Sequence, residues 1–169
     1  FRSGINIKMI SGDEEALYDY RALKSVSSCE SGVGCDLGGG SLQVFTFDRN
    51  GPIKSKSFPL GSSRMAKEYV SGAIPTMKEA EAINQRVKNE LFSAGFVPSK
   101  EKLLAMGGTA KAIKRLYMLT VKKEGAISAD ELSAMLEVIC RHPDEALDLF
   151  SDVEPKRAHT LAPGLAVLL

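Results

Sequence analysis

The sequence predicts an α/β fold: a mixed sheet with a three-strand antiparallel meander, helices on its faces, and a helical C-terminal extension. Three observations predict this fold. Apolar, β-branched and aromatic runs separated by turn residues indicate the meander between residues 34 and 60. Longer segments with a 3.6-residue apolar period and capping-box patterns indicate helices. A short apolar run at residues 102–106 leads directly into a helix and indicates one more strand.

The first part of the chain carries one strand signal and one helix signal before the meander begins. Residues 5–10 alternate apolar and polar side chains, which predicts a strand. Ser11 and Glu14 have capping-box spacing for a helix that should run to about Leu23. A small, polar stretch then leads to the three predicted meander strands, which cover residues 34–36, 42–47 and 53–60.

Helix signals dominate the rest of the chain. The predicted helices cover 62–70, 76–94, a segment from Gly107, a segment capped by Ser128 that Pro143 ends, 144–150, and 156–169 with an interruption at Pro163. We expect the strand at 102–106 to be buried, because its side chains are almost all apolar.

Composition excludes several classes of partner. The 169 residues carry a formal net charge of only +1, so electrostatics gives no argument for nucleic acid or an anionic membrane as a partner. No apolar run is long enough to span a bilayer. The three cysteines lack metal-ligand spacing, so we expect reduced thiols in a cytoplasmic protein.

The segment Cys35–Ser41 is the strongest candidate in the sequence for a functional site. Three consecutive glycines separate Asp36-Leu37 from Ser41. Glycines bring no side chain for packing, whereas successive N–H groups in a tight turn form a concave anion site. We therefore expect the N–H groups of residues 38–41 and the Ser41 hydroxyl to bind phosphate, with Asp36 holding Mg²⁺ or a metal-bound water. A glycine-rich hairpin turn without a ligand is the structural alternative.

Other well-known phosphate and catalytic signatures do not fit. Leu37 stands where a dinucleotide-binding fingerprint needs glycine or alanine, and Gly40 stands where a P-loop needs lysine. Gln43 stands where a nucleophile elbow around Ser41 needs glycine. Both histidines lie in the helical tail, which argues against a Ser-His-Asp triad and against a histidine metal site.

Three further features each have a functional and a structural interpretation. Gly107-Gly108-Thr109 opens a helix after a strand, where an anion would meet free N–H groups, or where the helix simply packs close to the sheet. Glu14 or Glu15 could be a general base acting on water, or could stabilise the helix N-terminus. Arg64 could bind a phosphate or be an ordinary surface arginine.

These segments, in this order, resemble the exopolyphosphatase / guanosine pentaphosphate phosphohydrolase family of the actin, Hsp70 and sugar-kinase superfamily. The resemblance rests on five segments: Ile10–Ala16, Asp36–Ser41, Pro59–Arg64, Met106–Ala110 and Pro163–Ala166. It covers nearly the whole chain. It implies a ribonuclease H-like domain, one of two that enclose a cleft.

The resemblance also implies an activity and a set of roles. The activity is Mg²⁺-dependent hydrolysis of a terminal phosphate from polyphosphate, or of the 5′-terminal phosphate from guanosine pentaphosphate, and a homodimer is left open as the assembly. Glu15 would match the glutamate that activates the attacking water, and Asp36 the aspartate that helps place metal and water. The second phosphate loop of the family would match Gly38, Gly39, Gly40 and Ser41.

Two residues depart from the family pattern. Leu17 stands where the family usually has arginine, and Gln43 where it usually has glutamate. Each change removes a charged group near the expected cleft, which bears on metal affinity and substrate choice.

The first phosphate loop of the family has no counterpart in these residues. We therefore expect residues 1–24 to be the last strand and helix of a first domain and residues 25–169 to be the second domain. We also expect this piece to fold without catalysing hydrolysis. Two alternatives remain: an ATP-binding half of a sugar-kinase-like or chaperone-like protein, or a catalytically silent phosphate- or nucleotide-sensing module, which Leu17 and Gln43 favour.

Overall fold

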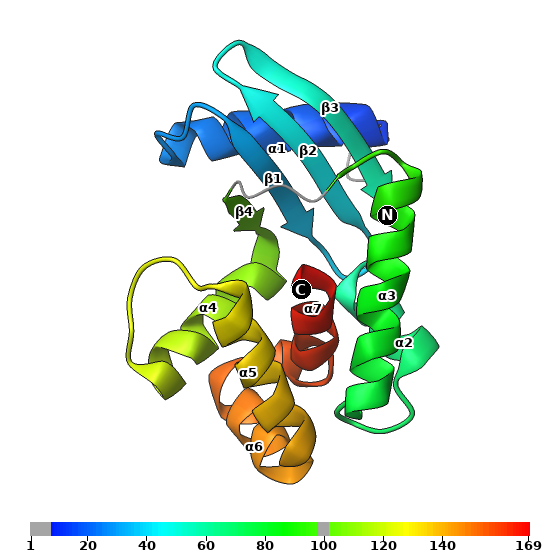
Figure 1. Cartoon of the computed structure of the whole chain (residues 1–169), viewed down its shortest axis with the longest axis vertical. Coiled ribbons are helices and arrows are strands. Elements are labelled where there is room, and N and C mark those ends of the chain that lie inside the picture. Colours follow the sequence, from blue (N-terminus) through cyan, green and yellow to red (C-terminus); the bar gives the residue numbers. More distant parts are fainter. Residues whose placement is uncertain (1–7, 98–101) are drawn as a thin grey trace, which may run out of the picture.

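The computed structural model describes residues 8–97 and 102–169, in which a sheet lies at one end of the molecule and most helices at the other (Figure 1). The strands are β1 (Gly32–Leu37), β2 (Leu42–Asp48), β3 (Gly51–Phe58) and β4 (Leu103–Met106). The helices are α1 (Gly12–Val26), α2 (Ser62–Tyr69), α3 (Met77–Ser93), α4 (Gly107–Val121), α5 (Ala129–Arg141), α6 (Pro143–Val153), the 3₁₀ helix η1 (Pro155–Thr160) and α7 (Leu161–Leu168). No helix among the described residues has the length and apolar character needed to cross a membrane.

The sheet is mixed and has the strand order β3-β2-β1-β4. The three meander strands pair antiparallel, whereas β4 pairs with β1 in parallel, so that Asp36 lies opposite Met106. The carboxyl ends of β1 and β4 therefore lie side by side and face the helical half of the molecule (Figure 1). In open α/β sheets this edge is where ligands bind.

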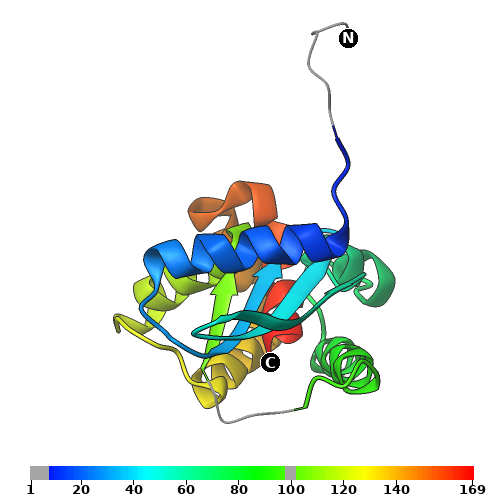
Figure 2. The ribbon, with the colours of Figure 1, turned by 90° about the horizontal axis from the view of Figure 1, so that it is seen from above.

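Helix α1 lies across one face of the sheet and contacts β3, β2 and β1 (Figure 2). Leu23 of α1 packs there against Phe45 and Phe47 of β2, which form a small apolar cluster. The ring of Phe45 occupies the space where a side chain at Gly34 would stand, since an added Cβ there would lie 2.2 Å from the ring. Glycine at this position makes room for the aromatic ring beside β1.

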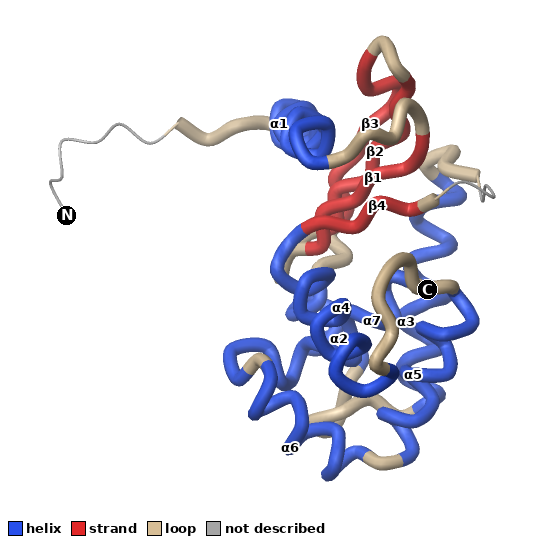
Figure 3. Tube along the Cα trace, turned by 90° about the vertical axis from the view of Figure 1, so that its left-hand side faces the viewer, coloured by secondary structure: helices blue, strands red, loops and turns tan. Residues whose placement is uncertain are grey.

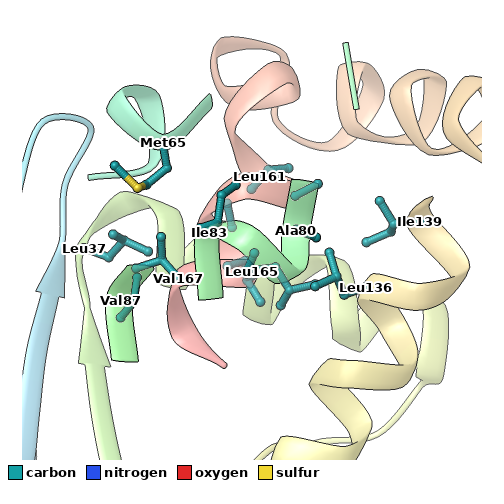
Figure 4. Close-up of a cluster of buried hydrophobic side chains, with 14 of the residues drawn as sticks. Leu37, Met65, Ala80, Ile83, Val87, Leu136, Ile139, Leu161, Leu165 and Val167 are labelled. Carbon is teal, nitrogen blue, oxygen red and sulfur yellow. The ribbon is translucent and has the colours of Figure 1, made fainter. Parts of the chain in front are cut away.

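The main core joins the opposite face of the sheet to the helical half (Figures 3 and 4). Helix α7 runs through the middle of this core, and every residue from Leu161 to Val167 is buried. Around it pack side chains from α2, α3 and α5, among them Met65, Ile83 and Leu136. A helix that is apolar on all sides is stable only when neighbours cover it in this way.

The predicted fold class is confirmed, including the meander, the flanking helices and the helical extension. The capping boxes predicted at Ser11, Thr76 and Ser128 are all formed. The strand predicted at 5–10 lies largely outside the described residues, and residues 8–10 have no regular structure.

Two expectations were wrong. Strand β4 is a half-exposed edge, because among the described residues it pairs only with β1 and both Leu103 and Ala105 are exposed. Pro163 does not interrupt the last helix, since the break lies at Thr160 and Pro163 falls in the first turn of α7, where its missing N–H removes no helical hydrogen bond.

Candidate functional site

The carbonyl groups of Gly38, Gly39 and Gly40 all face the first turn of α2. The Gly38 and Gly39 carbonyls accept backbone N–H groups of this turn at 2.9–3.0 Å, and the Gly40 carbonyl accepts a side-chain N–H at 3.2 Å. The donors are the backbone N–H groups of Ser62, Ser63 and Arg64 and the Nε of Arg64. The start of α2 has no side-chain cap, so the loop carbonyls satisfy N–H groups that a helix otherwise leaves without partners.

The N–H groups of the peptide units that follow Gly38, Gly39 and Gly40 point away from α2. A trans peptide holds its C=O and N–H in opposite directions, and no described peptide bond is cis. These N–H groups belong to Gly39, Gly40 and Ser41, and none of them donates a hydrogen bond within the described part of the chain. Gly38 differs, because its N–H closes the turn on Ser41 O at 3.0 Å. Three adjacent N–H groups facing one side form a concave anion site.

Close packing between α2 and the loop depends on Gly61. A Cβ at this residue would lie 2.4 Å from backbone atoms of both Gly39 and Gly40, so only glycine allows the two segments to approach. Arg64 lies on the carbonyl side of the loop and also pairs with Glu68 at 3.7 Å. In this position Arg64 supports the loop, and its contact with a phosphate stays a prediction.

The junction at Gly107-Gly108-Thr109 lies next to Asp36. Gly107 has φ +89°, and a Cβ there would lie 2.2 Å from Asp36 Oδ1, so glycine is required by both its backbone conformation and its neighbour. The N-terminus of α4 has no side-chain cap. The two predicted phosphate-binding junctions are therefore adjacent.

The side chains of Thr109 and Arg157 lie at the N-terminus of α4 and connect it to neighbouring elements. Thr109 is buried, and its hydroxyl lies 3.3 Å from that of Ser62, so it links α4 to α2. Arg157 of η1 places its guanidinium against Gly108, where an added Cβ would lie 2.3 Å from it, and also binds Glu154 at 3.0 Å. No sequence pattern pointed to Arg157, because it reaches Gly108 only through the packing of η1 against α6, α7 and α2.

A polar row crosses the α1 face of the sheet where β1 ends. Asp36, Gln43 and Ser57 lie directly opposite one another on β1, β2 and β3. Helix α1 places Glu15 above this row, and Gln43 Nε2 donates to Glu15 Oε2 at 2.7 Å. The predicted catalytic pair, Glu15 and Asp36, thus belongs to one cluster.

The two glutamates at the start of α1 have different roles. Glu14 completes the capping box, since its Oε2 accepts the Ser11 N–H at 2.9 Å while its own N–H donates to Ser11 Oγ. The hydrogen bond from the Ser11 N–H, followed by that from the Lys8 ammonium, holds the pKa of the Glu14 carboxyl below its usual value. Glu15 takes no part in the cap and is exposed on the sheet side of α1. Of the two, only Glu15 contacts the polar row, through Gln43, among the described residues.

Asp19 is a third carboxylate at this site, and sequence reasoning missed it. It follows Glu15 by one helical turn, and its Oδ2 is buried without a hydrogen-bond partner among the described residues. Burial, followed by the charges of Asp36 and Glu15, raises the pKa of Asp19 to about 6. Burial and the Glu15 charge also raise the pKa of Asp36, while Lys111 opposes the shift. The sequence did hold one signal for Asp19: it follows Glu15 by four residues, which places both side chains on the same face of a helix.

Asp36 and Asp19 are the candidate carboxylates for a magnesium ion that a substrate would also contact. Among the described residues, no group of three or more His, Cys, Asp or Glu side chains is arranged to hold a metal. Mg²⁺ seldom needs such a cage, because it usually takes one or two carboxylates together with waters and substrate phosphates. Asp36, next to Gly107 at the start of α4, would be the carboxylate ligand of such an ion, and the buried Oδ2 of Asp19, which has no partner among the described residues, would add local negative charge.

Comparison with solved structures shows the same fold. The Aquifex aeolicus member of the Ppx/GppA family matches with a TM-score of 0.82 at 19% identity, over 99% of this chain and 57% of that one. An exopolyphosphatase from Cytophaga hutchinsonii matches with a TM-score of 0.77 at 16% identity, over 97% of this chain and 57% of that one.

Comparison of sequences shows the family. A Haemophilus influenzae protein named "Putative exopolyphosphatase" is 24% identical over 167 residues, which are 96% of this chain and 51% of that protein. The chain thus spans about half the length of this curated relative. The model of the Ppx/GppA phosphatase family matches residues 2–169. With nearly every residue matched, the chain belongs to the Ppx/GppA phosphatase family.

Proposed function

We propose that this chain forms the phosphate-binding half of a phosphoric anhydride hydrolase that removes the terminal phosphate of polyphosphate or the 5′-terminal phosphate of guanosine pentaphosphate. The observation that carries the proposal is the row of three N–H groups at Gly39, Gly40 and Ser41, which face away from α2 and have no hydrogen-bond acceptor among the described residues. Family membership and likeness to exopolyphosphatases support the reaction class.

Some residues of the site would bind the phosphate, and Glu15 would transfer the proton. The loop N–H groups and the Ser41 hydroxyl hold phosphate oxygens and stabilise the charge that develops on them in the transition state. Glu15 is the general base: its Oε2 is held by Gln43, and its Oε1 accepts a proton from the attacking water. The start of α4 adds a second set of N–H groups beside Asp36.

Asp36 and substrate oxygens would together hold a Mg²⁺ ion. When bound, this ion would neutralise negative charge on the phosphates and on the nearby carboxylates. Asp36 suits the role because its raised pKa shows a carboxylate whose local environment opposes negative charge.

Removing one loop N–H tests the anion site. Gly40→Pro deletes this donor, and the matched Gly40→Ala keeps it, since no atom lies within 4 Å of the added Cβ. We expect isothermal titration calorimetry to show about tenfold weaker tripolyphosphate binding for Gly40→Pro and near-normal binding for Gly40→Ala. Equal affinities for both variants would contradict a direct role for this N–H.

Substitution of the two acidic residues in the full-length parent protein tests the chemistry. Glu15→Gln and Asp36→Asn should lower phosphate release from polyphosphate by at least a hundredfold while leaving the unfolding transition in place. We expect this chain by itself to bind phosphate without turnover, because it spans about half of its relatives. Full activity of both variants would refute the assignment.

A phosphate-sensing module is the second candidate, and Gln43 favours it because the residue brings an amide rather than a charge into the cluster. Specific binding of guanosine tetraphosphate by the parent protein, with no release of phosphate from polyphosphate or guanosine pentaphosphate, would identify a sensor. Hydrolysis of ATP alone would instead indicate the kinase-like alternative.

A further inference from the structure

Gln43 is one of three buried polar side chains at the candidate site, with Ser62 and Thr109, and it contacts three separate segments of the chain. Only 3% of its surface is exposed. Its Nε2 lies 2.7 Å from Glu15 Oε2 on α1, 2.9 Å from Ser41 Oγ in the glycine loop and 3.3 Å from Ser57 Oγ on β3. One amide nitrogen therefore joins the proposed base to the proposed phosphate loop.

The orientation of this amide follows from its strongest neighbour. A carboxylate oxygen only accepts hydrogen bonds, so the group 2.7 Å from Glu15 must be the NH₂. Turning the amide over would place two acceptors against each other. A hydrogen bond to a charged acceptor at this length is among the stronger ones in proteins.

We propose that Gln43 is a positioning residue, which orients Glu15 toward the attacking water and turns the Ser41 hydroxyl proton toward the bound phosphate. The first effect follows because Oε2 is held by Gln43, so that Oε1 is left to take the proton. The second follows because Ser41 Oγ accepts from Gln43, so its own proton is free to be donated elsewhere. The inference rests on the proposed function and adds a residue that acts through Glu15 and Ser41.

Two single variants of the full-length parent protein separate positioning from packing. Gln43→Met keeps the approximate size and removes the amide, and Ser57→Ala removes only the longest of the three contacts. We expect Gln43→Met to lower kcat for polyphosphate hydrolysis about tenfold to hundredfold, with a smaller change in KM. Ser57→Ala should stay within about threefold of the parent protein.

A double-mutant cycle with Glu15 decides whether Gln43 acts through the base. In a Glu15→Ala background, Gln43→Met should lower activity less than it does in the parent protein, because only its contact with Ser41 remains to be lost. An equal loss in both backgrounds would overturn the proposal, and so would a Gln43→Met single variant with unchanged kcat. If Glu15→Ala itself keeps its activity, the proposed function fails, and that result is distinct from failure of the positioning role.

A binding measurement on this chain provides a readout that does not depend on turnover. In ¹H–¹⁵N spectra, the side-chain NH₂ of Gln43 should shift when Glu15→Ala is introduced, and should shift when tripolyphosphate is added. An NH₂ signal that responds to neither change would contradict the contacts on which the proposal rests.

Discussion

At the scale of single residues, the candidate site places three carboxylates close together with few compensating charges. Asp19 shows the consequence, since one of its oxygens is buried without a partner among the described residues. Its pKa of about 6 lies above the ordinary aspartate value because of burial and, secondly, the charges of Asp36 and Glu15. The folded chain therefore binds this proton more tightly than the unfolded chain does.

This linkage predicts how Asp19 changes stability with pH. A carboxyl group with a raised folded-state pKa stabilises the fold fully below about pH 4 and loses that contribution as pH rises through 6. We expect Asp19→Asn to raise the free energy of unfolding by about 1 kcal/mol at pH 8, a value discounted for the partial exposure of the group, and not at pH 4. Urea unfolding at both pH values checks this. An equal effect at both would contradict it.

Gly107 carries a second prediction at this scale. Gly107→Ala forces a side chain into a backbone with φ +89° and against Asp36. Gly125→Ala is the matched control, because Gly125 has φ +103° and no atom near its missing Cβ. Urea unfolding should show a loss of about 1 kcal/mol for Gly125→Ala and a clearly larger loss for Gly107→Ala. Similar losses would mean that Asp36 moves aside freely.

At the scale of elements, the contact between α2 and the glycine loop fixes which way the loop N–H groups point. Gly61 permits this contact, because any Cβ there would meet the loop backbone. Gly61→Ala should therefore weaken tripolyphosphate binding and lower the free energy of unfolding by about 2 kcal/mol. The control is Gly72→Ala, where the nearest atom is 3.7 Å from the added Cβ and little should change. Unaltered binding by Gly61→Ala would show that α2 does not position the loop.

The elements also show what the sequence could and could not predict. Strands, helices and capping boxes were predictable because their signals are local, as with Ser11 and Glu14. The sequence could not predict which residues lie next to one another at the site, because Asp36 meets Gly107 only through the parallel pairing of β1 with β4. Side-chain partners such as Gln43 with Glu15, 28 positions apart, depend on how α1 crosses the sheet. Arg157 reaches Gly108 only through the packing of η1.

At the scale of the whole molecule, the sheet and the helical half meet where β1 and β4 end, and the site lies at that junction (Figure 1). Helix α7 fills the centre of the main core beneath it, and Gly164 of α7 packs against Thr109 at the start of α4. The core thus holds the loop, α2 and α4 in one arrangement. Such preorganisation is what anion stabilisation requires.

The central claim is that the N–H groups of Gly39, Gly40 and Ser41 receive a phosphate. The most direct test is titration of the ¹⁵N-labelled chain with tripolyphosphate while its backbone amide signals are followed. We predict the largest shifts at Gly39, Gly40 and Ser41, and a small one at Gly38, whose N–H is already bonded to Ser41 O. Binding that leaves these three amides unmoved would contradict the claim.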